Sequence, residues 1–259
     1  MTYQYIKFGI ERCVAIISLN RPEKRNALIP EMADEICDAL ANCSGARAIL
    51  LRGEGQSFCS GADISDVSEH RLSSDAAYDS LSQHYNPMLL AIARHELPVV
   101  AQVQGAVAGI GCSLALACDF CLAAEDAYFK LAFVNIGLAP DGGASWHLPR
   151  LVGGARAARL MMLGDELSAS RAADWGLIHS YVPNGALVQE GRALAERLAH
   201  GPTRALAAMK RNLAAAFDAS LAEVMENEAC EQRKIAQTDD AREGIEAFLQ
   251  KRAPLFRGE

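Results

Sequence analysis

Hydrophobic and polar positions predict alternating strands and helices up to about residue 185. Apolar runs typical of strands lie at 3–8, 14–19, 48–51, 99–103, 120–123, 127–130 and 178–182, with 9–12 as the first hairpin turn. Helical patterns cover 30–41, 76–94, 114–118, 145–151, 155–163 and 169–175, with Ser168 as an N-cap. From residue 187 only helices are predicted, at 187–199, 203–217, 221–236 and 239–250. This order predicts an α/β core followed by a helical appendage. Residues 65–82 are polar, and we expect a mobile stretch there.

Glycines interrupt the pattern where the strand 99–103 gives way to a buried helix. Gly105, Gly109 and Gly111 stand between the two elements. The first N–H groups of a helix have no intrahelical partner, so they can hold a negative charge that approaches the backbone at these glycines. Tight packing of the helix on the sheet is the alternative use of the same glycines, and this stretch alone favours it. The spacing matches neither the dinucleotide fingerprint nor a P-loop.

Composition narrows the class of protein. The chain has 259 residues, 22% of them charged, a net charge of −7 and a pI near 5.4, which argues against general nucleic-acid binding. The first residues resemble no signal peptide, and no apolar run is long enough for a membrane span. The cysteines lie mostly in apolar segments, which is typical of reduced thiols in a cytoplasmic protein. Neither they nor the scattered histidines form a metal motif, so we expect no metal.

Three loops, each after a predicted strand, carry the candidate chemistry. They are Arg-Pro-Glu-Lys-Arg-Asn-Ala-Leu at 21–28, Phe-Cys-Ser-Gly-Ala-Asp-Ile at 58–64, and the glycine-rich stretch that begins at Gly105. Together with the ending Glu-Gly-Ile-Glu-Ala-Phe-Leu-Gln-Lys-Arg at 243–252, this ordered set resembles the crotonase (enoyl-CoA hydratase/isomerase) superfamily. The resemblance covers nearly the whole chain.

The resemblance implies a crotonase-like (ClpP/crotonase) α/β fold, a spiral of repeated ββα units. Residues 1–195 would form the spiral core with the acyl-CoA site, and residues 196–259 a helical region that packs between subunits of a trimer or a dimer of trimers. The implied substrate is an acyl-coenzyme A thioester. Coenzyme A enters as part of that substrate, so no separate cofactor is expected.

The resemblance also assigns residues. Backbone N–H groups of Ala62 and Ile110 would form an oxyanion hole for the thioester carbonyl, which agrees with the anion-binding interpretation of the glycine-rich stretch. Phe248 and Lys251 would come from a neighbouring subunit. The full set expected to bind coenzyme A is Glu23, Lys24, Asn26, Ala27, Ala62, Asp63, Ile64, Gly109, Phe248 and Lys251. Asp63 is expected to support the oxyanion loop instead of transferring protons.

Two positions depart from the hydratases of this superfamily, which place two glutamates around a water molecule. By alignment with that pattern the chain has Ser113 and Phe133 there. Asp141, in Pro-Asp-Gly-Gly, is the remaining candidate for the group that transfers the proton. This sequence is a good turn in any protein, but in this superfamily the loop borders the acyl pocket. We therefore expect Asp141 to carry a proton from C2 to C4 of an enoyl-CoA, with Phe133 and Trp146 as apolar walls that raise its pKa.

The chain thus resembles the isomerase branch, and alternatives stay open. One is an enoyl-CoA hydratase. Another is an acyl-CoA dehalogenase or hydrolase with Asp141 as the nucleophile. A non-enzymatic member that only binds acyl-CoA is the third.

Overall fold

The computed structural model describes residues 2–64 and 74–259, and their strands form two sheets. The larger sheet has the order β1-β2-β3-β4-β6-β9, and the smaller has the order β5-β7-β8. Only β1 and β2 are antiparallel neighbours in the larger sheet as described, because helices connect the later strands. The strands are β1 (Ile6–Glu11), β2 (Val14–Leu19), β3 (Ala48–Gly53), β4 (Val99–Val103), β5 (Ala106–Ala108), β6 (Phe120–Ala124), β7 (Tyr128–Lys130), β8 (Leu167–Ser168) and β9 (Ser180–Val182).

The helices follow the predicted spans closely, and Ser168 caps α7 by accepting a hydrogen bond from Arg171 N at 3.4 Å. They are α1 (Pro30–Ala41), α2 (Ser74–Asp79), α3 (Asn86–Ala93), α4 (Ile110–Leu116), α5 (Ala144–Val152), α6 (Gly154–Leu163), α7 (Ala169–Asp174), α8 (Leu187–Ala199), α9 (Thr203–Ala216), α10 (Leu221–Ile235) and α11 (Asp239–Gln250). A π-helical segment, η3 (Ser80–Tyr85), joins α2 to α3, and η1 (Pro22–Lys24), η4 (Ala132–Ile136) and η5 (Asn184–Ala186) are 3₁₀ turns. Of the stretch 65–82 where we expect mobility, residues 65–73 lie outside the described residues, and residues 74–82 are helical, in α2 and η3.

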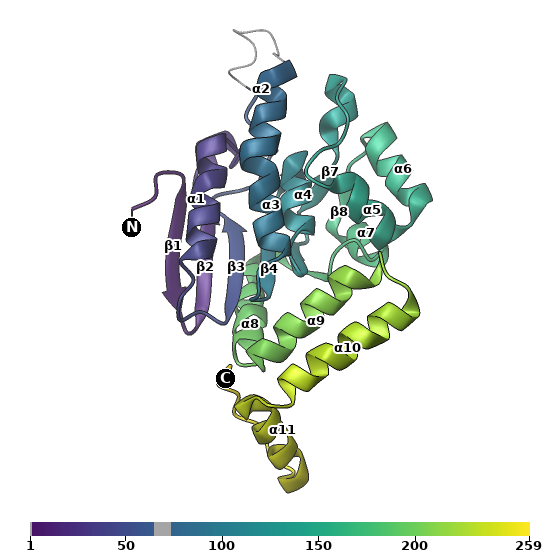
Figure 1. Cartoon of the computed structure of the whole chain (residues 1–259). Helices are drawn as coiled ribbons and strands as arrows, with labels where there is room; N and C mark the ends of the chain where they lie inside the picture. The colour runs from purple at the N-terminus through teal and green to yellow at the C-terminus, as the bar shows by residue number, and fades with distance from the viewer. Residues whose placement is uncertain (1, 65–73) are drawn as a thin grey trace.

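The central strands β3 and β4 of the larger sheet are buried on both faces, and successive residues of β3 face opposite sides. Ile49 and Leu51 belong to the main core, which α1 and α3 cover (Figure 1). Leu50 packs on the opposite face in a second cluster with Ala195 and Ala199 of α8. Helix α8 therefore continues across residue 195, where we expect the core to end, and the proposed division into two regions remains a prediction.

The C-terminal helices extend away from the sheets. Helices α9 and α10 run side by side, and α11 projects beyond them (Figure 1). Phe217 is 61% exposed and Phe248 is 81% exposed in the single chain. Such apolar exposure is typical of surfaces that another chain covers, so packing between subunits stays a prediction for this region. None of the helices within the described ranges combines the length and the apolar character needed to cross a membrane.

Local geometry corrects three predictions. The first hairpin does not turn at 9–12: β1 runs to Glu11, and Arg12 and Cys13 form the turn with positive φ angles of 48° and 62°. Helix α4 begins at Ile110 instead of residue 114, because Gly111 continues the helix. Between Gly105 and Gly109 the chain forms β5, which was not predicted because it has only three residues.

Candidate functional site

The three predicted loops lie next to one another. Leu28 pairs with Ala62, and Cys59 pairs with Val107, as isolated parallel bridges. Leu28 N donates to Gly61 O at 2.8 Å, and its carbonyl accepts from Asp63 N at 2.8 Å. The middle loop, 58–64, is thus held on both sides by backbone hydrogen bonds.

The predicted oxyanion donors lie on two facing loops. A Cβ atom on Gly109 would stand only 3.6 Å from Gly61 Cα, so these loops approach closely beside Ala62 and Ile110. Gly109 has φ 51° and ψ −130°, a conformation that only glycine adopts without strain, and it leads directly into α4. Hydrogen bonds in the described part of the chain leave the N–H groups of Ala62 and Ile110 without an acceptor. The N–H group of Ile110 has no intrahelical acceptor because Ile110 is in the first turn of the helix.

Asp141 lies in a loop that packs on the first turn of α4. Ser113 Oγ donates to the backbone carbonyl of Asp141 at 3.0 Å. The carboxylate itself is poorly solvated: its Oδ1 is buried and has no hydrogen-bond partner among the described residues. Burial raises the pKa of Asp141 from 3.8 to about 6. A carboxylate with this pKa is a stronger base than an ordinary aspartate and is still ionised at neutral pH.

Of the two apolar walls expected around Asp141, the structure supports one. Phe133 is buried, and its Cζ would lie 3.9 Å from a Cβ on Gly109. Trp146, in contrast, is 41% exposed; its ring packs under the Arg150 guanidinium, 4.1 Å from the ring centroid. No described contact places Trp146 on Asp141. His147 follows it, and burial and Arg150 lower its pKa, which favours the neutral ring.

The loop expected to hold coenzyme A is rigid at its base and open at its tip. Asn26 is fully buried, and its Nδ2 donates to the carbonyls of Glu54 and Ser57 at 2.9 and 2.8 Å. Ala27 is also buried, whereas Glu23 and Lys24 are exposed. The Asn26 side chain therefore shapes this loop, and only the tip offers side chains to a ligand.

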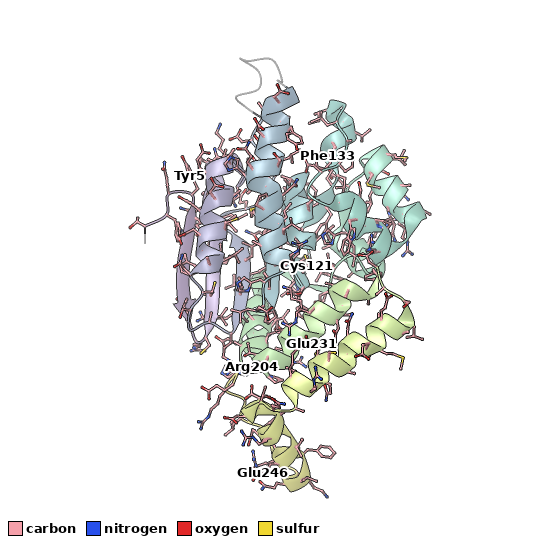
Figure 2. All side chains as sticks on the ribbon, viewed as in Figure 1. Tyr5, Cys121, Phe133, Arg204, Glu231 and Glu246 are labelled. Atoms are coloured by element: carbon pink, nitrogen blue, oxygen red, sulfur yellow. The ribbon has the colours of Figure 1, made fainter. Side chains whose placement is uncertain are left out.

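The remaining predicted contacts lie apart from these loops in the single chain. Phe248 and Lys251 are at the end of α11, and Figure 1 shows α11 projecting at the bottom of the molecule, away from α4, which lies near its middle. Figure 2 shows the same separation between Phe133 and Glu246, a residue of α11. Their contribution from a neighbouring subunit stays a prediction. Ile64 is 55% exposed at the edge of the described region.

Tyr85 lies beside the loops, on the helix predicted at 76–94, where the sequence alone does not favour it as a site residue. It is buried at the end of the π-helical segment, and its hydroxyl donates to Leu28 O at 3.1 Å. Burial raises its pKa, and Asp141 and Asp63 are among the charges that raise it further. Its place on a helix that could cover the pocket was the sequence signal, but the contact with Leu28 O depends on tertiary packing. π-Helical turns often accompany functional sites.

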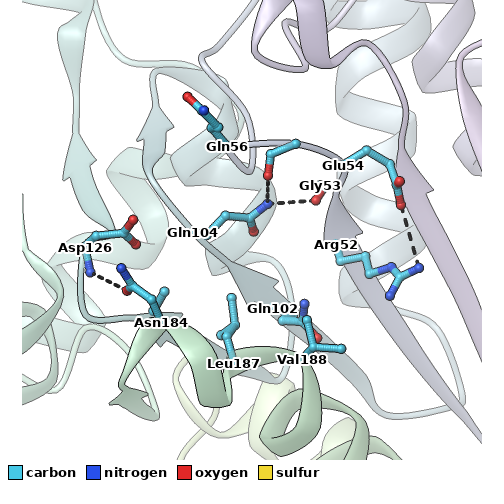
Figure 3. Close-up of a pocket in the computed structure, with 12 residues that line it drawn as sticks. Arg52, Gly53, Glu54, Gln56, Gln102, Gln104, Asp126, Asn184, Leu187 and Val188 are labelled. Atoms are coloured by element: carbon cyan, nitrogen blue, oxygen red, sulfur yellow. Dashed lines mark hydrogen bonds and ion pairs between the residues drawn. The ribbon is translucent and has the colours of Figure 1, made fainter.

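A separate cavity of about 680 Å³ lies beside the α8 face of the larger sheet (Figure 3). Polar side chains dominate it, including Gln102, Gln104 and Asn184. None of the predicted site residues lines it. Among the described residues, no group of histidine, cysteine or acidic side chains is arranged to hold a metal ion.

The comparison with known proteins agrees with this arrangement. The family model described as enoyl-CoA hydratase/isomerase matches residues 9–259. The chain belongs to the enoyl-CoA hydratase/isomerase family. A probable enoyl-CoA hydratase of Rhodobacter capsulatus is 43% identical over the full length of both chains. The 1,2-epoxyphenylacetyl-CoA isomerase of Escherichia coli is 37% identical, with 98% of this chain and 99% of that protein covered.

Solved structures identify the fold of this family member. A putative enoyl-CoA hydratase/isomerase from Mycobacterium abscessus superposes with a TM-score of 0.93 at 37% identity, covering 98% of this chain and 100% of that chain. The predicted crotonase fold is therefore confirmed. The relatives carry both hydratase and isomerase names, so family membership gives an activity of the hydratase/isomerase type and leaves the exact reaction open.

Proposed function

We propose that this family member is an enoyl-CoA isomerase that moves a double bond from C3 to C2 of an acyl-CoA thioester. The observation that carries the proposal is the carboxylate of Asp141, whose buried Oδ1 has no hydrogen-bond partner among the described residues, on a loop packed against the helix that begins with Ile110. A double-bond shift needs one base that removes a proton and returns it two carbons away. It also needs donors for the oxygen that becomes negative.

The reaction follows from these parts. The Asp141 carboxylate removes a proton from C2, and the electron pair of that C–H bond moves toward the thioester, so the carbonyl oxygen becomes an enolate. The N–H groups of Ala62 and Ile110 donate to this oxygen. The electrons of the C3–C4 double bond then take the proton from Asp141 at C4. At the same time the C1–C2 π electrons of the dienolate move between C2 and C3, and the oxygen lone pair re-forms the thioester carbonyl, so the double bond ends between C2 and C3 and Asp141 is again ionised. Phe133 excludes water from the intermediate.

Coenzyme A would lie along the first two of the three loops, 21–28 and 58–64. Lys24, exposed at the tip of its loop, suits a phosphate, and the backbone near Ala27 and Ala62–Ile64 suits the adenine and pantetheine groups. Asn26 and Asp63 hold these loops in place, and Glu23 at the exposed tip and Gly109 on the facing loop complete the proposed contacts with coenzyme A. In this proposal Phe248 and Lys251 come from a second copy of the chain in a trimer or a dimer of trimers.

Hydration is the second candidate, because the relative at 43% identity carries a hydratase name. Adding water needs one group to activate the water and another to deliver a proton. Ser113 already donates its hydroxyl to Asp141 O, and Phe133 has no proton to exchange. Burial is the cause of the raised pKa of Asp141, and no neighbouring carboxylate in the described residues contributes to it. These observations favour the isomerase.

The deciding experiment supplies the purified enzyme with a 3-enoyl-CoA and, separately, a 2-enoyl-CoA. We expect the first to give 2-enoyl-CoA, and the second to give no more than traces of 3-hydroxyacyl-CoA. Asp141→Asn should lower isomerisation by at least about 10³-fold while binding of a saturated acyl-CoA changes little. Near-normal isomerisation by this variant, or rapid hydration by the wild type, would contradict the proposal. Asp126→Asn, at an exposed aspartate, is the matched control.

A further inference from the structure

Ser113 links the two halves of the proposed chemistry. It lies three residues after Ile110, so both belong to the first turns of α4. Ser113 is fully buried, and its hydroxyl donates to the Asp141 carbonyl at 3.0 Å. One helical turn therefore carries both a predicted oxyanion donor and the anchor of the predicted base.

Gly142 allows the Asp141 loop to approach α4 closely. A Cβ atom on Gly142 would lie 2.8 Å from Ser113 Cβ and 3.0 Å from Ile110 Cγ1, nearer than side chains pack. Its φ of 59° also suits glycine. The backbone of the Asp141 loop thus packs directly on the side chains of Ser113 and Ile110, because Gly142 has no side chain of its own to hold it away.

The rest of the loop has little other support. Residues 134–139, which precede Pro140, are all exposed. Beyond the turn that Ala144 N closes on the Asp141 carbonyl at 3.1 Å, the described anchor of Asp141 to another element is Ser113. Removal of the serine hydroxyl would leave the carbonyl satisfied by Ala144 while loosening its tie to α4.

We propose that Ser113 is a positioning residue that fixes the distance between the Asp141 carboxylate and the Ile110 N–H. This inference rests on the proposed isomerase function and deepens it. A 1,3-proton shift is demanding, because one carboxylate must reach two carbons while the thioester oxygen stays on its donors. Misplacement by about 1 Å typically costs about 100-fold in rate. The serine therefore sets the geometry of the reaction without touching the substrate.

Three variants test the proposal. Ser113→Ala removes the hydroxyl, and Ser113→Thr retains it. Cys118→Ala removes a sulfur beyond the other end of the same helix, where its Sγ donates to Leu114 O at 3.4 Å. We expect Ser113→Ala to lower kcat about 10- to 100-fold with KM changed less than about threefold. Ser113→Thr should recover most of this loss, and Cys118→Ala should stay near the wild type.

A second measurement separates positioning from loss of stability. In D₂O, a well-placed carboxylate returns much of the original proton to C4, whereas a displaced one exchanges with solvent first. Ser113→Ala should therefore raise deuterium incorporation at C4, and Cys118→Ala should not. Equal kcat and equal deuterium incorporation in Ser113→Ala and Cys118→Ala would overturn the positioning role. If Asp141→Asn stayed active, the proposed function itself would fail, whatever the serine variants did.

Discussion

Arg21 and Asp63 form an ion pair whose nitrogen and oxygen lie 2.9 Å apart, although they are far apart in the sequence. Their side chains are only 14% and 13% exposed. Arg21 also donates to the Ala27 carbonyl. The pair thus joins the loop expected to hold coenzyme A to the loop that carries Ala62, in agreement with a supporting role for Asp63.

Asp63→Ala should destabilise the protein, because it leaves the Arg21 guanidinium largely buried without its partner. We expect a loss of about 1–3 kcal/mol in the free energy of unfolding, below the range for fully buried pairs because both side chains keep some solvent contact. Urea denaturation measures it. The double variant Arg21→Met/Asp63→Ala should recover part of the loss. A double variant less stable than the sum of the single changes would contradict this account.

Asn26→Ala should damage the fold and the coenzyme A loop together. The side chain is fully buried, and its amide bridges residues 54 and 57 while its Oδ1 accepts from Arg21 N at 2.9 Å. Its removal leaves buried backbone groups without partners, at a cost of about 2–4 kcal/mol. Thermal unfolding should show the loss, and acyl-CoA affinity should fall. Lys24→Ala, at the exposed tip of the same loop, should weaken binding without changing stability.

The sequence predicts the long elements because their signals are repeated over many residues. Helices 30–41 and 239–250 were placed to the residue, since a proline or a threonine cap marks each start and an amphipathic pattern continues to the end. Short elements lack this repetition. The strands β5 and β8 have three and two residues, and their pairing with β7 depends on tertiary contacts that local sequence does not encode.

The candidate site shows the same limit. The motif around Asp141 and the glycines before Ile110 could be found from sequence, because turns and close backbone approach need particular residue types. The contact between Ser113 and the Asp141 carbonyl could not, since any buried serine has the same local sequence signal. Trp146 was expected to line the site because it follows Asp141 closely, yet the helix that starts at Ala144 turns it toward Arg150.

Tyr85→Phe should weaken catalysis more than stability. The Tyr85 hydroxyl donates to Leu28 O, which also accepts from Asp63 N, so it supports the segment that carries Ala62. The substitution removes one hydrogen bond of about 1 kcal/mol and keeps the ring. We expect kcat to fall about 3- to 10-fold, because the oxyanion donor gains freedom. Steady-state kinetics checks this, with Tyr78→Phe, at a 70% exposed tyrosine, as the control.

Asp141→Asn should stabilise the protein at neutral pH. In the folded state burial raises the pKa of Asp141 to about 6, from 3.8. Between these values the folded protein holds a proton that the unfolded chain releases, so stability falls as pH rises through this window, and the full cost is present above pH 6. After allowance for partial solvent exposure, the neutral amide should raise the free energy of unfolding by about 1–2 kcal/mol at pH 7.5. The gain should vanish near pH 4, where the carboxyl group is protonated in the folded protein.

Urea denaturation of both proteins from pH 4 to 8 measures the difference, and Asp126→Asn should change stability by less than about 0.5 kcal/mol throughout. A gain independent of pH would show that burial of the Asp141 charge is not its cause.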